Sequence, residues 1–265
     1  MNIIVCVKQI PDPETPATAF KVDEAAKKVI PAQGIAPVIS PYDVQAVEAA
    51  LRIRDAKGEG KITILSIGPA SARDVIKHAL AMGADEGVLV DDPALYDNPD
   101  PFVTAQVLTA AIQKIGDYNL ILCGRAAADW DYGIAPSGIA ETLNLPCVTV
   151  AKKIEAVNGT VKVDKVLADG FETVEAQAPC VVTVSNEFGD PRYPQLRQIM
   201  AAARKQVDVW TLADLGLSPD QLQRRITIEK LYVPVKQSNV EIIEGDSAEE
   251  QAANLAKKLR DARLI

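Results

Sequence analysis

The sequence predicts an α/β fold: a parallel sheet with helices on both faces, like that of nucleotide-binding domains, with an added antiparallel hairpin and a C-terminal arm. Two observations predict the sheet. Apolar segments of strand length recur, and segments with helical periodicity separate the first four of them. The apolar segments are also continuous rather than alternating, which indicates strands that helices bury on both faces.

The predicted strands of the parallel sheet are short apolar runs. They span residues 2–7, 61–67, 87–90, 119–123, 148–150 and 180–184. The helices between them place apolar side chains at helical spacing, and two of them end at a glycine, which commonly stops a helix. The predicted helices cover residues 41–55, then 71–82 before Gly83, 102–115 before Gly116, and 137–143.

The second half of the chain has a different pattern. Residues 148–157, 160–167 and 172–176 have the composition of short strands, and Asn158-Gly159 separates the first two. A two-residue Asn-Gly turn is typical of a β-hairpin. We therefore expect an antiparallel hairpin added to the parallel sheet.

The C-terminal region combines a long irregular stretch with one clear helix. Residues 207–245 show little core pattern, although residues 230–235 resemble a strand. A stretch of this length is unusual inside one compact domain, and it fits either an arm that packs on another subunit or a domain edge. Ser247 and Glu250 predict a capping box for the last helix. Its apolar stripe consists of Leu255, Leu259 and Ala262.

Composition and charge exclude several classes of function. The net charge is −8, with 48% apolar and 24% charged residues, which argues for a soluble protein that binds no nucleic acid. No apolar run approaches the roughly 18 residues of a membrane span. No signal peptide is recognisable, so we expect a cytoplasmic protein. The four cysteines lack metal-like spacing and the only histidine is His78, so neither a metal site nor a catalytic histidine is expected.

The most informative segment is the loop from Gly124 to Pro136. It follows the predicted strand 119–123 and precedes the predicted helix 137–143, which is where α/β folds bind nucleotides. The loop contains no lysine, so it lacks a residue that ATP-hydrolysing phosphate loops require. Its composition therefore indicates a nucleotide that is held without being cleaved.

Residue types in this loop predict how the nucleotide is held. Small residues at Gly124 and at positions 126–128 let backbone N–H groups approach a phosphate, and Gly133 and Ala135 add donors near the start of the helix. Asp129 and Asp131 would repel a phosphate. We expect these two carboxylates either to accept hydrogen bonds from ribose hydroxyls or to cap the helix.

Several motifs, taken in order, resemble the β subunit of electron transfer flavoproteins. Each motif alone is weak, but together they span nearly the whole chain. They are the opening Val5–Asp12, the segment Ala79–Asp85, Pro191-Arg192-Tyr193 with Leu196 to Met200, Leu212–Leu217, and Ile243–Gly245 before the last helix.

The resemblance implies a partner, cofactors and an activity. The family forms a heterodimer with an α subunit, and an FAD held chiefly by α collects electrons from an acyl-CoA or other flavin dehydrogenase. The β subunit holds a second nucleotide, which is AMP in electron carriers and FAD in electron-bifurcating members. Residues 1–190 would form the nucleotide-binding domain, and residues 191–265 would recognise partners and pack on α. The chain would be an electron carrier rather than an enzyme, except in the bifurcating alternative.

The resemblance also implies site residues. The nucleotide site corresponds to Cys6, Ser40, Pro41, Tyr42, Asp43, Ile67, Gly124, Arg125, Ala126, Ala127, Ala128, Asp129, Trp130, Asp131, Tyr132, Gly133, Ile134 and Ala135. Leu196 corresponds to an exposed leucine that anchors the partner dehydrogenase; the alternative is a leucine packed in the core with Ile199 and Met200.

Two aromatic residues depart from the family pattern. Trp130 and Tyr132 stand where bifurcating relatives usually have Gly and Thr, so AMP is favoured over a second FAD. Trp130 is expected to stack on an adenine, contact a partner or cover the sheet edge.

A different class of function also stays open, namely a stand-alone nucleotide-binding sensor with a related α/β domain.

Overall fold

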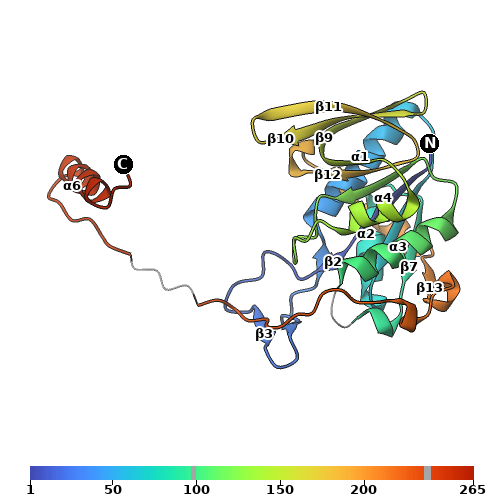
Figure 1. Cartoon of the computed structure of the whole chain (residues 1–265), viewed down its shortest axis with the longest axis horizontal. Helices are drawn as coiled ribbons and strands as arrows, with labels where there is room; N and C mark the ends of the chain where they lie inside the picture. The colour runs from blue at the N-terminus through green and yellow to red at the C-terminus, as the bar shows by residue number, and fades with distance from the viewer. Residues whose placement is uncertain (97–99, 236–239) are drawn as a thin grey trace. The chain divides into compact units, whose positions relative to one another are not determined.

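The computed structural model describes residues 1–96, 100–235 and 240–265. The chain forms two compact units, residues 1–231 and residues 232–265. The first unit contains the sheet, and the second contains one helix within its described residues (Figure 1). The predicted division after residue 190, with an arm packed on a partner chain, stays a prediction.

Within the described residues, nine strands form one sheet in the order β11-β10-β9-β12-β8-β1-β6-β7-β13. The seven strands β9, β12, β8, β1, β6, β7 and β13 pair with their neighbours in parallel. The pairs β9-β10 and β10-β11 are antiparallel. The predicted α/β class is therefore confirmed. The strands are β1 (Ile3–Cys6), β6 (Ile62–Ile67), β7 (Glu86–Val90), β8 (Leu120–Gly124), β9 (Cys147–Val157), β10 (Thr160–Leu167), β11 (Gly170–Gln177), β12 (Cys180–Val184) and β13 (Asp208–Trp210).

The antiparallel hairpin is confirmed and lies at one edge of this sheet. Asn158 and Gly159 join β9 to β10 with φ values of +49° and +83°, the backbone that a two-residue hairpin turn requires. Two small antiparallel pairs were not predicted. They are β2 (Gln9–Ile10) with β5 (Val38–Ile39), and β3 (Lys21–Asp23) with β4 (Lys28–Ile30).

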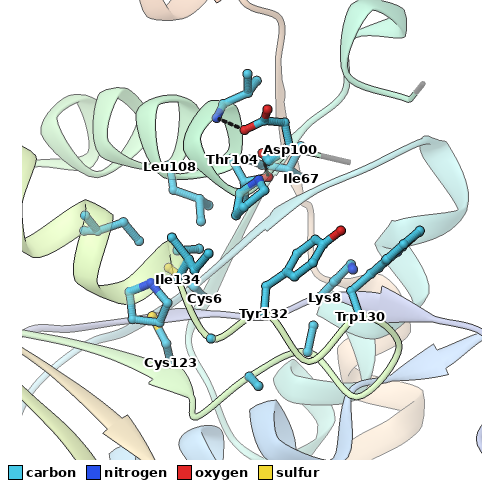
Figure 2. Close-up of a pocket in the computed structure, with 18 of the residues that line it drawn as sticks. Cys6, Lys8, Ile67, Asp100, Thr104, Leu108, Cys123, Trp130, Tyr132 and Ile134 are labelled. Carbon is cyan, nitrogen blue, oxygen red and sulfur yellow. Dashed lines mark hydrogen bonds between the residues drawn. The ribbon is translucent and has the colours of Figure 1, made fainter. Parts of the chain in front are cut away.

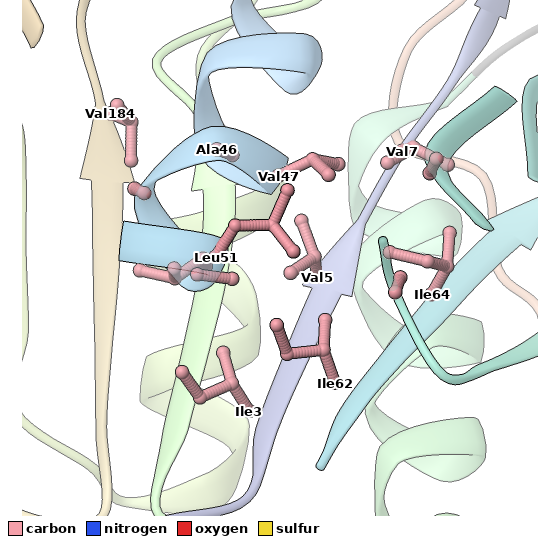
Figure 3. Close-up of a cluster of buried hydrophobic side chains, with 14 of the residues drawn as sticks. Ile3, Val5, Val7, Ala46, Val47, Leu51, Ile62, Ile64 and Val184 are labelled. Carbon is pink, nitrogen blue, oxygen red and sulfur yellow. The ribbon is translucent and has the colours of Figure 1, made fainter. Parts of the chain in front are cut away.

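Helices cover both faces of the parallel part of the sheet. One face packs against α1 (Pro41–Lys57) and α2 (Arg73–Met82), and the other against α3 (Pro101–Ile115) and α4 (Ala135–Leu143). Figure 3 shows Ala46, Val47 and Leu51 of α1 above Val5 and Ile3 of β1. The helix α5 (Leu196–Arg204) contacts α2. All four helices predicted around the sheet are thus found, within two residues of their predicted ends.

The predicted strand at residues 230–235 is wrong. This segment has no regular structure, and Tyr232, Val233 and Val235 are exposed. Pro234 has no amide hydrogen for a strand ladder, and the sheet edge beside β7 is already paired with β13.

The second unit is a capped amphipathic helix, α6 (Ala248–Asp261). The hydroxyl of Ser247 accepts a hydrogen bond from the amide of Glu250, which confirms the predicted cap. The carboxylate of Glu250 accepts from the amide of Asp246 at 2.9 Å rather than completing the box at Ser247. Among the described residues, none of the helices combines the length and apolarity that crossing a membrane requires.

Candidate functional site

A cavity of about 240 Å³ opens at the carboxyl ends of β1 and β8. These two strands are neighbours, but the chain continues from β1 to β6 on one side and reaches β8 on the other. This reversal of strand order leaves a crevice, and ligands of open α/β sheets bind in such crevices. Figure 2 shows Cys6 and Cys123 on the strands, with Thr104 and Leu108 of α3 opposite.

The structure brings most of the predicted nucleotide-site residues to this cavity. Those that line it are Cys6, Asp43, Ile67, Gly124, Ala126, Ala127, Trp130, Tyr132, Gly133, Ile134 and Ala135. The other predicted residues do not line it: Ser40, Pro41, Tyr42, Arg125, Ala128, Asp129 and Asp131. Several of this second group instead hold the lining residues in place.

Asp43 ties the ends of the two central strands together. Its carboxylate accepts hydrogen bonds from the amide of Lys8 at 2.8 Å and from the amide of Gly124 at 3.1 Å. Asp43 is buried in the first turn of α1, and this burial raises its pKa to about 7. A Cβ atom at residue 124 would lie 2.5 Å from the Asp43 carboxylate, so the close approach of β8 to α1 requires glycine there.

The loop after β8 is fixed by an ion pair with Lys8, which lies two residues after β1. The ammonium of Lys8 contacts both carboxylate oxygens of Asp129, at 2.7 and 2.8 Å. The same carboxylate accepts a hydrogen bond from the amide of Trp130 at 3.0 Å. Asp129 therefore orients the residue that follows it, and its charge is balanced by a cation before any ligand binds.

Arg125 and Tyr42 fasten the other end of the loop to α1. The guanidinium of Arg125 donates a hydrogen bond to the Tyr42 hydroxyl at 2.7 Å, and its central carbon lies 4.5 Å from the centre of the Tyr42 ring. Both residues thus attach the start of the loop to α1 without lining the cavity. The predicted capping role of Asp129 or Asp131 is wrong, because the N-cap of α4 is Ile134 and no side chain caps this helix.

The opposite wall of the cavity comes from α3 and from a late segment of the chain. Asp100 is buried before α3, and one carboxylate oxygen accepts hydrogen bonds from the amides of Phe102 and Val103. Its other oxygen accepts from the amides of Arg225 and Ile226, at 2.6 and 2.8 Å. Asp100 therefore fastens this late segment beside the cavity.

Among the described residues, four polar side chains that line the cavity were not predicted as site residues: Lys8, Asp100, Thr104 and Arg224. Lys8 follows a predicted strand directly, and Asp100 precedes a proline at a helix start, which is a recognisable N-cap signal. Arg224 lies in the stretch without a core pattern, so no local signal identifies it.

Leu196, the predicted partner anchor, lies on the surface. Its side chain is 73% exposed, and Tyr193, Ile199 and Met200 are exposed around it. The alternative that Leu196 packs in the core with Ile199 and Met200 is therefore wrong. These four residues, Tyr193, Leu196, Ile199 and Met200, are called the apolar patch below.

An ion-pair cluster holds the segment that leads into the apolar patch. Glu48 of α1 is buried and accepts hydrogen bonds from Arg52 at 2.7 Å and from the guanidinium of Arg192 at 2.8 and 3.2 Å. Burial by itself raises the pKa of Glu48, but the hydrogen bonds from Arg192 and Arg52 outweigh it and lower that pKa. The Pro-Arg-Tyr motif thus attaches the start of the apolar patch to the sheet domain.

The chemistry of the cavity is that of binding. The thiols of Cys6 and Cys123 lie on paired positions of β1 and β8. Their hydrogen bond and their burial hold the pKa of the Cys123 thiol well above its usual value, so this thiol is protonated at neutral pH. The carboxylates of Asp43 and Asp100 accept hydrogen bonds from backbone amides. The site therefore offers apolar walls, small-residue backbone and the N-terminus of α4.

Comparisons with known proteins agree with this picture. Residues 27–215 match the sequence profile of the electron transfer flavoprotein domain. The chain is 33% identical to the caffeyl-CoA reductase-Etf complex subunit CarD of Acetobacterium woodii, over 100% of both chains. It is 35% identical to the electron transfer flavoprotein subunit beta of Thermoanaerobacterium thermosaccharolyticum, also over 100% of both chains. The acryloyl-CoA reductase electron transfer subunit gamma of Anaerotignum propionicum is 36% identical, over 77% of this chain and 75% of the relative.

A profile match over most of the chain and full-length relatives above 30% identity lead to one conclusion. The chain belongs to the electron transfer flavoprotein β-subunit family.

Proposed function

We propose that this chain is the β subunit of a heterodimeric electron transfer flavoprotein and holds an adenine nucleotide, AMP, in the cavity between β1 and β8. The observation that carries the proposal is the position of the cavity. It lies where the strand order reverses and is lined by a small-residue loop that contains no lysine. Such a site can hold a nucleotide by backbone N–H groups and has no group that would transfer its phosphate.

The dimensions and chemistry of the cavity favour a mononucleotide. Its volume of about 240 Å³ is below the roughly 300–1,000 Å³ that is common for pockets of drug-sized ligands. Gly124, Ala126 and Ala127 allow close approach of a phosphate to the backbone, and Gly133 to Pro136 bring the N-terminus of α4 to the same space. The apolar wall from α3 suits the base.

The apolar patch is the proposed docking surface for an acyl-CoA dehydrogenase or another flavin dehydrogenase. A group of exposed apolar side chains rimmed by charged ones is typical of a protein-binding surface, and Arg197 and Arg204 flank Leu196 and Met200 on α5. The chain itself performs no bond chemistry in this proposal. The FAD carries the electrons, and the protein supplies distance, orientation and contact with partners. This FAD is held by the α subunit or shared with it.

A second candidate function is an electron-bifurcating subunit that holds a second FAD accepting hydride from NADH. It is favoured by the relatives whose names place them with caffeyl-CoA reductase and acryloyl-CoA reductase. The small cavity volume and the aromatic residues Trp130 and Tyr132 favour AMP instead.

Mass spectrometry of the nucleotides released from the purified heterodimer distinguishes these candidates. One FAD and one AMP per heterodimer supports the electron carrier, whereas two FAD support the bifurcating subunit. Purification without any flavin-bearing partner would support a stand-alone nucleotide-binding sensor. Release of no adenine nucleotide beyond one FAD would contradict the proposed site.

A further inference from the structure

We propose that Trp130 and Tyr132 form an aromatic stacking site for the flat ring of the nucleotide. This inference rests on the proposed function, since it assigns the ring-binding part of the same cavity. The two rings stack on each other, with centroids 5.7 Å apart and planes inclined by 22°. Both side chains line the cavity, and Figure 2 shows Tyr132 between Trp130 and the residues Cys6 and Ile134.

The aromatic pair is held in place before a ligand binds. Asp129 accepts a hydrogen bond from the Trp130 amide and is itself paired with Lys8. The backbone turns on both sides of Tyr132, at Asp131 and at Gly133, with φ values of +52° and +62°. A rigid aromatic surface loses little entropy on binding, so its stacking energy is retained as affinity.

The surroundings of the pair include apolar surface that suits a planar ring. Tyr132 is 38% exposed, so part of its ring is accessible to a ligand. Leu108, Ile134 and Ile139 provide apolar surface in the same cavity. Two carboxylates in the cavity lining, Asp43 and Asp100, accept hydrogen bonds from backbone amides. A purine or an isoalloxazine ring therefore finds π-faces and apolar contacts here. The cations Lys8 and Arg224 also line the cavity, and Lys8 is paired with Asp129.

The chain contains only two tryptophans, Trp130 and Trp210, which makes the proposal directly measurable. Trp210 lies in β13, with the Lys114 ammonium 4.5 Å from the centre of its ring, and does not line the cavity. Stacking of a base on Trp130 or on its partner Tyr132 changes Trp130 emission and leaves Trp210 emission unchanged.

The experiment uses the full chain, in its heterodimer, after removal of bound nucleotide. Tryptophan emission is recorded during titration with AMP for the wild type, Trp130→Phe and Trp210→Phe. The quenching is expected to persist in Trp210→Phe and to disappear in Trp130→Phe. Ribose 5-phosphate, which lacks the ring, is expected to cause no quenching.

Calorimetric affinities provide a second measurement. Tyr132→Leu is expected to weaken AMP binding about tenfold, as for loss of one base–aromatic stack, whereas Tyr132→Phe keeps the ring and retains the affinity. Binding of ribose 5-phosphate is expected to be the same in all three proteins. A melting temperature within about 2 °C of wild type, less than a 1 kcal/mol change produces, shows that Tyr132→Leu is folded.

Three results would overturn the stacking site. If AMP binds with unchanged Trp130 emission and with equal affinity in Tyr132→Leu, the ring lies elsewhere while the proposed nucleotide function stands. If ribose 5-phosphate quenches Trp130 as strongly as AMP does, the signal reports loop movement rather than stacking. If neither AMP nor FAD binds the chain, the proposed function fails together with this inference.

Discussion

The ammonium of Lys8 contacts both oxygens of the Asp129 carboxylate, at 2.7 and 2.8 Å, across 121 residues of sequence. The segment just after β1 thus fixes the loop that follows β8. Because Lys8 is 37% exposed, we expect Lys8→Met to reduce the free energy of unfolding by less than about 1 kcal/mol. Its larger effect is expected on nucleotide retention, because the loop loses its fixed position. Retention after gel filtration measures this, and Lys57→Met, at the far end of α1, is the control. Equal retention in both variants would show that the ion pair is dispensable for the site.

Asp43 is expected to make stability depend on pH. Since burial raises its pKa to about 7, the folded chain binds a proton there that the unfolded chain has released. The contribution of Asp43 is therefore fully present below about pH 4, the ordinary range of an aspartate, and is lost as pH rises through 7. Urea unfolding between pH 5 and pH 8 should show that the stability difference between wild type and Asp43→Asn shrinks with rising pH. A difference that grows instead would mean that the amides of Lys8 and Gly124 keep the carboxylate ionised.

Arg192 is expected to contribute strongly to stability through Glu48. The Glu48 side chain is only 4% exposed, so Arg192→Met removes hydrogen bonds from a buried carboxylate and should cost about 1–3 kcal/mol. The pKa of Glu48 is lowered in the folded chain, so this stabilisation is present above its ordinary pKa and lost as pH falls. The penalty, measured by urea unfolding, should therefore be smaller at acidic pH than at pH 7. Arg197→Met on the exposed side of α5 serves as control, and a similar penalty in both variants would contradict the assignment.

Leu196→Ala is expected to slow electron transfer from the partner dehydrogenase about tenfold, the loss expected for one hot-spot side chain. Its stability should be unchanged, because the side chain is 73% exposed. Stopped-flow reduction of the flavin measures the rate. Leu167→Ala on the hairpin, also an exposed leucine, is the matched control. A rate equal to that of the control would remove the apolar patch as a docking surface.

A bound nucleotide is expected to protect Cys6 and Cys123 from alkylation, because both thiols line the cavity. Cys147 is exposed and lies outside it, so its reaction should be independent of nucleotide. Mass spectrometry of peptides after treatment with N-ethylmaleimide gives the three rates, with and without AMP. Cys123 should react faster as pH rises, because its thiol pKa is raised and the thiolate is the reactive form. Protection of Cys147 as well would point to a global change in place of a ligand in the cavity.

The sequence alone predicted the sheet because its strands are continuous apolar runs. Each of these strands can be recognised from its own residues alone. The Asn158-Gly159 turn can be recognised as well, because both residue types favour the positive φ values that the turn requires. The strand β13 was not predicted, because it has only three residues and its place beside β7 is set by tertiary pairing rather than by local pattern. The false strand at residues 230–235 shows the converse, since apolar residues form a strand only where a partner edge is free.

The residues of the candidate site also divide into those that the sequence predicts and those that it does not. Gly124 and the small residues after it were found because their position after a strand is visible in sequence. The partners of Asp129 and Asp100 were not predictable, because Lys8 and Arg225 are 121 and 125 residues away from them. Long-range pairs of this kind depend on which strands are neighbours, and an isolated sequence does not state that order.

The hydrogen bonds from the Arg225 and Ile226 amides to Asp100 have a consequence for dissecting the protein. They place Arg224 in the cavity wall, although most of the other lining residues come from the first 140 positions. A deletion that removes the C-terminal region from residue 224 onward therefore also opens the cavity. A fragment that ends at residue 231, where the first compact unit ends, keeps these three residues and the wall they form.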